Sequence, residues 1–275
     1  MRTLASVLGL SRARIYALKK TNEFTQRKEK KMKDEEKLLG MIEELVKQFP
    51  FYGYRRITAV LRYQRGLNVN WKRVYRIMRK HKLNMPPSLS RKKLFRGIPY
   101  SNRTRVERSN ELWGIDMTYI WCGEDAWAYM HAVIDHHDKE LLGYQFSQSC
   151  KAIGGVMALA DAASKRQVDS LELRSDNGCH YGARVFREEI KRLGIKHTRT
   201  MVNTPKGNAV VERFFKSLKE ECVWQQAFRN FEEAKVAVDK WVEFYNTERP
   251  HQALGYETPQ RYYAKQYNPS LRKIA

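Results

Sequence analysis

Three apolar or alternating stretches follow one another after residue 109, and the short gaps between them constrain the fold most. They cover residues 113–120, 126–134 and 141–147, with turns at 122–125 and 136–139. Runs of this length joined by short turns are typical of an antiparallel meander. Helical and strand-like stretches then alternate: a helix at 152–164, a strand at 171–175, a helix at 183–193, a strand at 195–198 and a helix from residue 209. This part of the chain is therefore predicted to be an α/β domain.

The region before it is predicted to be helical. Apolar residues recur at helical spacing over 36–49, and Pro50 ends that pattern; a second helix is expected over 52–62, and Asn70 is placed to cap a third. The basic residues of these helices are Arg55, Arg56, Lys72, Arg73, Arg76, Arg79 and Lys80. A three-helix unit with one basic helix, at 36–84, fits a module that reads DNA in the major groove. A solvated charged face is the alternative explanation.

The flanking segments carry weaker signals. Residues 3–19 resemble a helix-turn-helix fragment in which Ser11 caps the second helix, although a short amphipathic helix pair explains them equally well. Residues 20–37 are almost wholly polar, which indicates a linker or the start of an exposed helix, so 1–35 is taken as one N-terminal segment. Residues 85–108 are expected to form an extended basic linker with Arg91, Lys92 and Lys93, and 266–275 a C-terminal tail.

Charge is distributed unevenly along the chain. The net charge is +22, and residues 1–108 hold 29 Lys and Arg against 8 Asp and Glu (29 − 8 = +21), while 109–275 hold 23 against 22 (23 − 22 = +1). Phosphate neutralisation supplies most sequence-independent affinity for nucleic acid, so the first part is expected to grip a polyanion. A merely soluble basic surface and an anionic membrane surface are the alternatives.

Membrane and redox signals are both absent from the sequence. No run of about 18 apolar residues appears and the N-terminus lacks an apolar signal core, so we expect a cytosolic protein that does not span a membrane. Cys122, Cys150, Cys179 and Cys222 are widely spaced and form no Cys-x-x-Cys pair. Free thiols in a reducing compartment fit this spacing better than a zinc site or a disulfide framework.

Three acidic residues stand where a catalytic metal site needs them. Asp116 lies within the first strand-like run, Asp176 follows the fourth, and Glu212 lies on the late helix, 36 positions after Asp176 (212 − 176 = 36). Two divalent cations held by carboxylates can activate the nucleophile and stabilise the leaving oxygen in phosphoryl transfer on DNA. Each acid alone has a plainer explanation, because Asp-Asn-Gly is good turn chemistry and Glu212 can pair with Lys216 on the helix surface.

Four separated motifs carry a family resemblance. They are Trp-x-x-Asp-x-Thr-Tyr-Ile at 113–120, Ser-Asp-Asn-Gly at 175–178, Asn-x-x-x-Glu-Arg-Phe-Phe-Lys-Ser-Leu-Lys at 208–219 and Arg-Pro-His-Gln-Ala-Leu-Gly-Tyr-Glu-Thr-Pro at 249–259. Together they resemble the DDE transposases of the retroviral-integrase superfamily, and within it the bacterial insertion-sequence group whose second reading frame, OrfB, carries the catalytic core. Residues 50–56 and 69–74 are similar to that group's helical module.

The resemblance implies a fold, a reaction and a set of partners. The fold is a ribonuclease-H-like integrase core at 109–265, a five-stranded mixed sheet with flanking helices, preceded by an all-α helix-turn-helix DNA-binding region. The reaction is Mg²⁺-dependent strand cleavage and strand transfer, with Asp116, Asp176 and Glu212 as ligands of two ions, for which Mn²⁺ is a possible substitute. The implied partners are terminal inverted repeats, target DNA, further copies of the chain and a first-frame subunit, in a bacterial nucleoid. The retroviral His-His-Cys-Cys zinc module is absent, since no Cys precedes Cys122.

Further residues have weaker claims to a role. Asn177, His180, Lys206, Lys216 and Lys219 are candidate DNA contacts because they lie close to the acids in sequence or share the Glu212 helix face. Asp135 is expected to be a structural turn acid, Arg249 to seal the core, and Trp241 and Tyr245 to be core residues. A metal-dependent nuclease of the same fold and a non-catalytic DNA-binding regulator remain the alternative functions.

Overall fold

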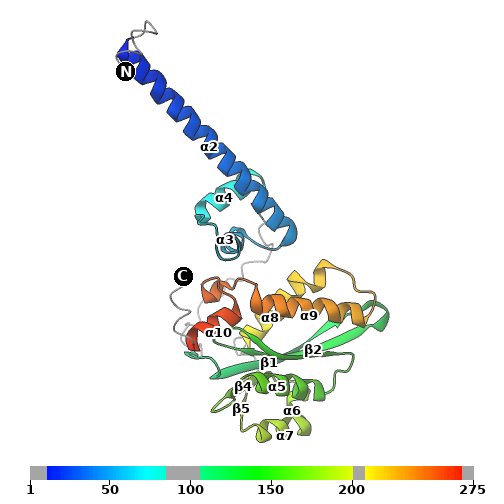
Figure 1. Ribbon diagram of the computed structural model, residues 1–275. Coiled ribbons are helices and arrows are strands. Elements are labelled where there is room, and N and C mark those ends of the chain that lie inside the picture. The colour runs from blue at the N-terminus through cyan, green and yellow to red at the C-terminus, as the bar shows by residue number, and fades with distance from the viewer. Residues whose placement is uncertain (1–10, 85–105, 201–207, 268–275) are drawn as a thin grey trace, which may run out of the picture. The chain divides into compact units, whose positions relative to one another are not determined.

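The computed structural model describes residues 11–84, 106–200 and 208–267. The chain divides into two compact units, Met1–Ser88 and Leu89–Ala275, which we call the helical unit and the sheet unit (Figure 1). No helix in the described part of the chain is long and apolar enough to cross a membrane.

The helical unit begins with one long helix, α2, over Arg12–Gln48. The Oγ of Ser11 accepts a hydrogen bond from the Arg14 backbone N–H at 3.3 Å, as the predicted cap requires. Of the two alternatives for residues 20–37, the linker is wrong and the helix is right, because these residues continue α2 without a break. Lys, Arg, Glu and Met are strong helix formers, and no Gly or Pro stands between residues 12 and 39. Residues 1–10, the first half of the predicted helix-turn-helix fragment, lie outside the described residues.

Two shorter helices pack on the second half of α2. They are α3, Tyr54–Tyr63, and α4, Trp71–Lys80. The buried side chains of this core are Leu38, Ile42, Leu45, Ile57, Leu61, Val74, Ile77 and Met78. Asn70 caps α4 by accepting the Lys72 N–H at 2.9 Å, and the Arg62 guanidinium donates to the Val69 carbonyl at 2.7 Å. The three helices predicted from periodicity are confirmed.

The sheet unit is built on five strands in the order β3-β2-β1-β4-β5. They are β1, Leu112–Trp121; β2, Trp127–Asp135; β3, Leu141–Ser147; β4, Glu172–Ser175; and β5, Lys196–Arg199. β1, β2 and β3 form an antiparallel meander, whereas β4 runs parallel to β1 and β5 parallel to β4. The mixed five-stranded sheet implied by the resemblance is confirmed.

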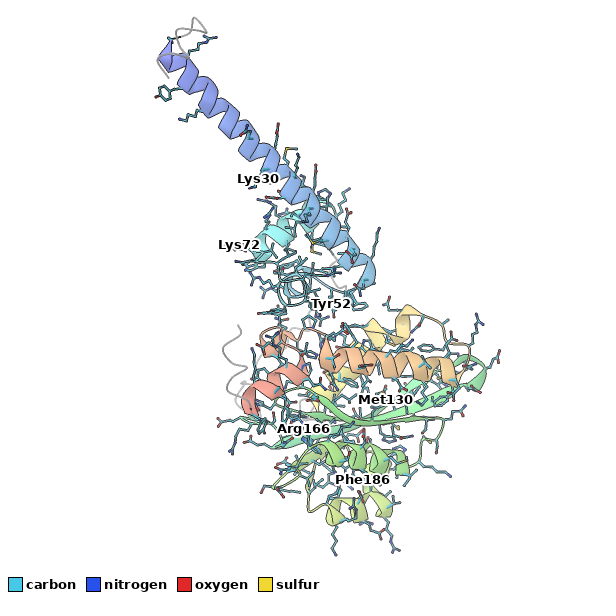
Figure 2. The ribbon with its side chains drawn as sticks, in the orientation of Figure 1. Lys30, Tyr52, Lys72, Met130, Arg166 and Phe186 are labelled. Atoms are coloured by element: carbon cyan, nitrogen blue, oxygen red, sulfur yellow. The ribbon has the colours of Figure 1, made fainter. Side chains whose placement is uncertain are left out.

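Helices cover both faces of the sheet (Figure 1). On one side lie α5, Ile153–Lys165, α6, Cys179–Gly182, and α7, Arg184–Arg192; on the other lie α8, Ala209–Glu221, and α9, Phe231–Thr247; α10 is Pro259–Tyr267. Two apolar cores result. One, on the side of α5 and α7, contains Ile115 and Phe186, and the other, on the side of α8 and α9, contains Met130, Trp241 and Tyr245 (Figure 2). The prediction that Trp241 and Tyr245 are core residues is confirmed.

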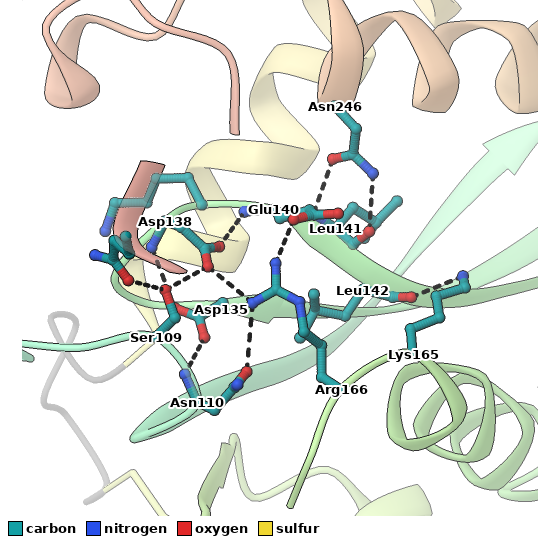
Figure 3. A network of polar contacts seen from close by, with 12 residues as sticks. Ser109, Asn110, Asp135, Asp138, Glu140, Leu141, Leu142, Lys165, Arg166 and Asn246 are labelled. Atoms are coloured by element: carbon teal, nitrogen blue, oxygen red, sulfur yellow. Dashed lines mark hydrogen bonds and ion pairs between the residues drawn. The ribbon is translucent and has the colours of Figure 1, made fainter. Parts of the chain in front are cut away.

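A buried polar network closes the turn between β2 and β3 (Figure 3). Asp135 accepts backbone hydrogen bonds from Asn110 at 2.7 Å and His137 at 2.6 Å. Arg166, at the end of α5, bridges Asp138 at 3.0 Å and Glu140. The predicted structural role of Asp135 is confirmed, because its oxygens are engaged in holding the turn.

A second buried ion pair closes the far end of α8. Both oxygens of Glu221 accept from the Arg249 guanidinium at 2.6 Å, and Ser217 Oγ accepts from Arg249 Nη2 at 3.3 Å. Arg249 and Glu221 are both buried. Arg249 therefore seals the core, as predicted.

Candidate active site

The sheet brings Asp116 and Asp176 to the same level on neighbouring strands. β1 and β4 are parallel, and Gly114 pairs with Arg174. Asp116 and Asp176 each lie two residues further along, Asp176 just past the end of β4. Asp116 Oδ1 accepts the Met117 N–H at 2.7 Å, and Asp176 Oδ1 accepts the Gly178 N–H at 2.8 Å. The second hydrogen bond is the one expected of an Asp-Asn-Gly turn. Asp176 therefore both stabilises the turn and contributes a carboxylate to the site.

Glu212 reaches the site because the start of α8 is fixed against β1. Asn208 is buried, and its Nδ2 donates to the Ile115 carbonyl, one residue before Asp116, at 2.9 Å. The Glu212 N–H donates to the Asn208 carbonyl at 3.1 Å, which places Glu212 one helical turn from this anchor. The helix can approach so closely because residue 114 is Gly: a Cβ there would lie 2.6 Å from Asn208 Oδ1, His136 Nε2 and Val211 Cγ2.

The three acids interact electrostatically. Burial raises the pKa of Asp116 to about 6, the Met117 N–H opposes that rise, and the negative charges of Asp176 and Glu212 add to it. Asp116 is half-buried, whereas Asp176 and Glu212 are exposed. Burial, with Asp116 and Asp176 nearby, also raises the pKa of Tyr181 well above its ordinary value. Residues far apart in the sequence therefore form one negative, accessible site.

The donor chemistry of this site fits a hard divalent cation. Carboxylate oxygens are the ligands that Mg²⁺ prefers. A cation stabilises the charged form of Asp116, whose pKa is raised by burial and by repulsion from Asp176 and Glu212. Among the described residues, no three His, Cys, Asp or Glu side chains already lie close enough together to enclose a metal ion. The three carboxylates therefore interact electrostatically, but in this conformation they do not enclose a metal-binding cavity.

The lysines predicted beside Glu212 lie along α8. Glu212 and Lys216 are exposed and Lys219 is half-buried, while Val211, Phe215 and Leu218 form the buried stripe. Lys216 pairs with Glu220 at 3.5 Å, so the surface pair Glu212–Lys216, the plainer explanation, is not the one observed. The Lys219 Nζ lies 5.0 Å from the centre of the Tyr119 ring.

Asn177 and His180 follow Asp176 closely and are held by neighbouring groups. Asn177 is exposed, and its Nδ2 donates to the Thr200 carbonyl at 2.8 Å. The half-buried His180 ring lies 5.7 Å from the ring of His131, which burial keeps neutral by lowering its pKa to about 4. Both residues border the site, whereas Lys206 lies outside the described residues.

The basic residues predicted in the helical unit are only partly available to a ligand. Arg55 lies over Tyr54 and Trp71 at 5.8 and 5.9 Å, and Arg56 lies over Tyr52 at 5.1 Å. The side chains of Lys72, Arg76, Arg79 and Lys80 are exposed and Arg73 is half-buried. Arg76 and Lys80 both pair with Glu35 of α2, at 3.3 and 3.9 Å. Arg91, Lys92 and Lys93 lie outside the described residues.

Sequence reasoning missed the residues that support the site. Gly114, His136 and Asn208 meet where α8 crosses β1, and neither the role of Gly114 nor that of Asn208 was predicted. His136 lies at the start of the turn predicted at 136–139, and no further role was predicted for it. The signal available in the sequence was the position of Asn208, one helical turn before Glu212, but its partner on β1 follows from the packing alone.

Comparison with known proteins identifies both units. Two models described as integrase core domain match residues 106–205 and 193–259, and a model described as HTH-like domain matches residues 33–91. Transposase InsD for insertion element IS2A/D/F/H/I/K of Escherichia coli is 28% identical over 272 residues, covering 93% of this chain and 88% of the relative. Transposase InsD for insertion element IS2-9 of Escherichia coli K12 is also 28% identical, with 93% and 86% covered.

One solved structure shares the fold over most of the chain. It is a simian T-cell lymphotropic virus intasome in complex with the PP2A regulatory subunit B56 gamma, with a TM-score of 0.53 and 14% identity, covering 81% of this chain and 74% of that chain. At this identity the likeness supports the integrase-type fold alone.

Proposed function

Since this chain belongs to the insertion-sequence transposases with an integrase catalytic core, we propose that Asp116, Asp176 and Glu212 are its catalytic metal ligands. The observation that carries the proposal is the geometry, in which parallel β1 and β4 bring Asp116 and Asp176 to one level and Asn208 fixes the start of the Glu212 helix against β1. Burial and the charges of Asp176 and Glu212 raise the pKa of Asp116. Three carboxylates gathered on an accessible edge without a cation repel one another, so a bound divalent cation stabilises the arrangement.

The proposed reaction has two steps at the ends of the element. Water first attacks a phosphodiester and releases a 3′ hydroxyl; that hydroxyl then attacks a phosphodiester of the target, so one bond forms for each bond that breaks. Two Mg²⁺ ions, with Mn²⁺ as a substitute, supply positive charge to the reacting oxygens when bound. The two aspartates project from the sheet and Glu212 from α8, and Lys216 and Lys219 extend along α8 towards the flanking phosphates. No protein nucleophile is needed.

The rest of the chain is proposed to hold DNA. Residues 109–275 have a net charge of only +1. The net charge of +21 on residues 1–108 therefore supplies most of the electrostatic attraction to the terminal inverted repeats. Arg55, Lys72, Arg76 and Arg79 are proposed to contribute from the helical unit. Pairing two ends requires at least a dimer on DNA, and a first-frame subunit is a further proposed partner. Action on the chromosome places this work at the bacterial nucleoid.

Strand cleavage and joining test the proposal directly. Labelled terminal-repeat DNA is incubated with target DNA, Mg²⁺ and the full chain, and nicked and joined products are separated. We expect Asp116→Asn, Asp176→Asn and Glu212→Gln each to reduce both products by at least about 100-fold, since even residues that only support metal ligands cost 10- to 100-fold. DNA binding should persist in all three.

Glu220→Gln is the matched control, because Glu220 lies two turns further along α8 and pairs with Lys216. It should retain both products. Wild-type activity in any of the three acid variants contradicts the assignment. Nicked products without joined ones indicate a nuclease, and DNA binding without chemistry indicates a regulator.

A further inference from the structure

The end of the β1–β2 hairpin has one covered face and one bare face. β3 ends at Ser147, opposite Tyr129, so beyond that level β1 and β2 form a two-stranded arm. On one face of this arm Ile120, Cys122 and Ala128 are buried in the core with α8 and α9. On the other face Tyr119, Trp121 and Trp127 remain exposed by 56%, 52% and 45%. We call these three side chains the aromatic cluster.

The cluster is held as a unit. The Trp127 ring lies 5.1 Å from the ring of Tyr119 and 5.1 Å from the ring of Trp121, edge-on to both. Such edge-to-face contacts stabilise ring pairs and fix their orientation. Three large aromatic rings thus stand together on the surface, each of them about half exposed.

The arm that carries the cluster is anchored at its tip. The Glu124 N–H donates to the Arg229 carbonyl at 2.9 Å, and Asp125 accepts the Phe231 N–H at 2.8 Å. A Cβ at Gly123 would collide with the backbone oxygens of Phe228 and Arg229, so the two segments are in close backbone contact. The rings are therefore displayed on a fixed strand pair and not on a free loop.

The cluster lies further along the strand that carries Asp116. Tyr119 is three residues after Asp116 on β1, so the two side chains point to opposite faces of the sheet. Lys219 of α8 connects the two faces, because its Nζ lies 5.0 Å from the centre of the Tyr119 ring. Lys219 also lies two turns after Glu212 on α8. The charge around the cluster is uneven, because Glu124 is exposed at the tip whereas Asp125 is engaged by Phe231. A phosphate backbone is therefore favoured on the Lys219 side.

We infer that the aromatic cluster stacks on unpaired bases of the DNA strand that flanks the phosphate held by the acids. This inference rests on the proposed function, because it assigns the flanking strand of the same substrate. Aromatic rings bind bases through stacking worth about 1–3 kcal/mol per base, and an adjacent cation suits the backbone between them. Three side chains match one or two bases in size. A stable interface between two copies of the chain buries about 1,200–2,000 Å² in total, which is more surface than three side chains provide.

Binding measured without metal tests this inference apart from the chemistry. Full-length protein in EDTA is titrated against two labelled terminal-repeat duplexes, one blunt and one with three unpaired nucleotides at the cleaved end. Wild type should bind the frayed end more tightly. Trp127→Ala should reduce that preference by about tenfold, which corresponds to about 1.4 kcal/mol and lies within the range for one stacked base.

Four further variants separate stacking from loss of structure. Trp224→Ala removes another exposed tryptophan, 66% accessible and outside the cluster, and should leave the preference unchanged. Tyr119→Phe keeps the ring and should keep the preference, whereas Tyr119→Leu should lose it. Trp127→Phe keeps a ring at the centre of the cluster and should retain most of the preference even if Trp127→Ala proves unstable.

An unchanged preference in Trp127→Ala and Tyr119→Leu overturns the inference. So does a shift from dimer to monomer in sedimentation velocity without a change in preference, because the cluster then joins two copies of the chain. Absence of Mg²⁺-dependent nicking with the preference intact in EDTA overturns the proposed catalysis while supporting the stacking.

Discussion

Two groups of three acids lie in the same sheet unit, and their negative charges are neutralised in different ways. Asp135, Asp138 and Glu140 are the network acids. Arg166 pairs with Asp138 and Glu140, and Asp135 and Asp138 accept hydrogen bonds from backbone N–H groups (Figure 3). Asp116, Asp176 and Glu212 are the site acids, and the pKa of Asp116 is raised by burial and by the charges of the other two. A raised pKa does not distinguish the groups, because burial and Asp138 also raise the pKa of Asp135. The two groups differ because the network contains a cation of the protein itself, the guanidinium of Arg166.

The comparison shows where a carboxylate acts as scaffold and where it acts as ligand. In the network, Arg166 and Asp138 are both buried, and the Ser109 hydroxyl donates to Asp138 at 2.6 Å. The carboxylate oxygens of Asp138 are therefore not accessible to solvent. In the site, Asp176 and Glu212 are exposed on the edge beside β1. A cation from solution can reach the second group and not the first.

Removing the network's cation should have the largest effect on stability. Arg166→Ala leaves Asp138 and Glu140 buried without their partner, and we expect a loss of about 3–5 kcal/mol in the free energy of unfolding. Denaturant unfolding followed by circular dichroism measures it. Arg192→Ala removes an exposed arginine paired with Glu189 and should cost under about 1 kcal/mol. Equal losses in the two variants would contradict the view that the network is scaffold.

Loosening the anchor of Glu212 should affect the site more than the fold. Asn208→Ala removes the hydrogen bond to the Ile115 carbonyl and frees the start of α8. We expect the Mg²⁺ concentration for half-maximal nicking to rise by about 10- to 100-fold, as for other residues that orient metal ligands.

Asn230→Ala is the control for this change, because Asn230 caps α9 by accepting the Glu233 N–H at 2.9 Å. Its loss should cost about 1 kcal/mol in stability and leave the Mg²⁺ requirement unchanged. If the two variants shift the Mg²⁺ requirement equally, Asn208 acts only through stability.

Neutralising a site acid should stabilise the metal-free protein, which is the smallest effect expected. The pKa of Asp116 is raised from 3.8 to about 6 in the folded protein, so stability falls as pH rises from about 4 to about 6 and stays lowered above pH 6. In EDTA at pH 7, Asp116→Asn should be more stable than wild type by about 1–2 kcal/mol, and the difference should vanish as pH falls below about 4. Thermal unfolding between pH 4 and 8 measures it. A variant less stable than wild type at pH 7 would place Asp116 with the scaffold acids.

Much of the sheet unit is predictable from the sequence, because local patterns determine it. The three meander strands, the turn after Asp176 and the helix carrying Glu212 follow from alternation, turn residues and helical spacing. The sequence leaves the continuity of the long helix α2 open, because a polar stretch without Gly or Pro is compatible with both a linker and a solvated helix. The contact of Gly114 with Asn208 depends on how α8 crosses β1, which no local pattern encodes.

The aromatic cluster illustrates the same limit on prediction. Tyr119 and Trp121 alternate with Thr118 and Ile120, and this pattern predicts a strand without indicating which face is covered. In the structure α8 and α9 pack on the opposite face of this arm, against Ile120, Cys122 and Ala128, and the aromatic face is left exposed. Exposure of those rings therefore depends on where the helices pack in the assembled domain.

Anomalous diffraction from Mn²⁺ tests the central claim most directly. Crystals of the full chain with a terminal-repeat duplex, grown with Mn²⁺ in place of Mg²⁺, are measured at the manganese absorption edge. The account predicts anomalous peaks among Asp116, Asp176 and Glu212 and none among Asp135, Asp138 and Glu140. A peak at the network acids, or an empty site between the three site acids with DNA bound, would contradict it.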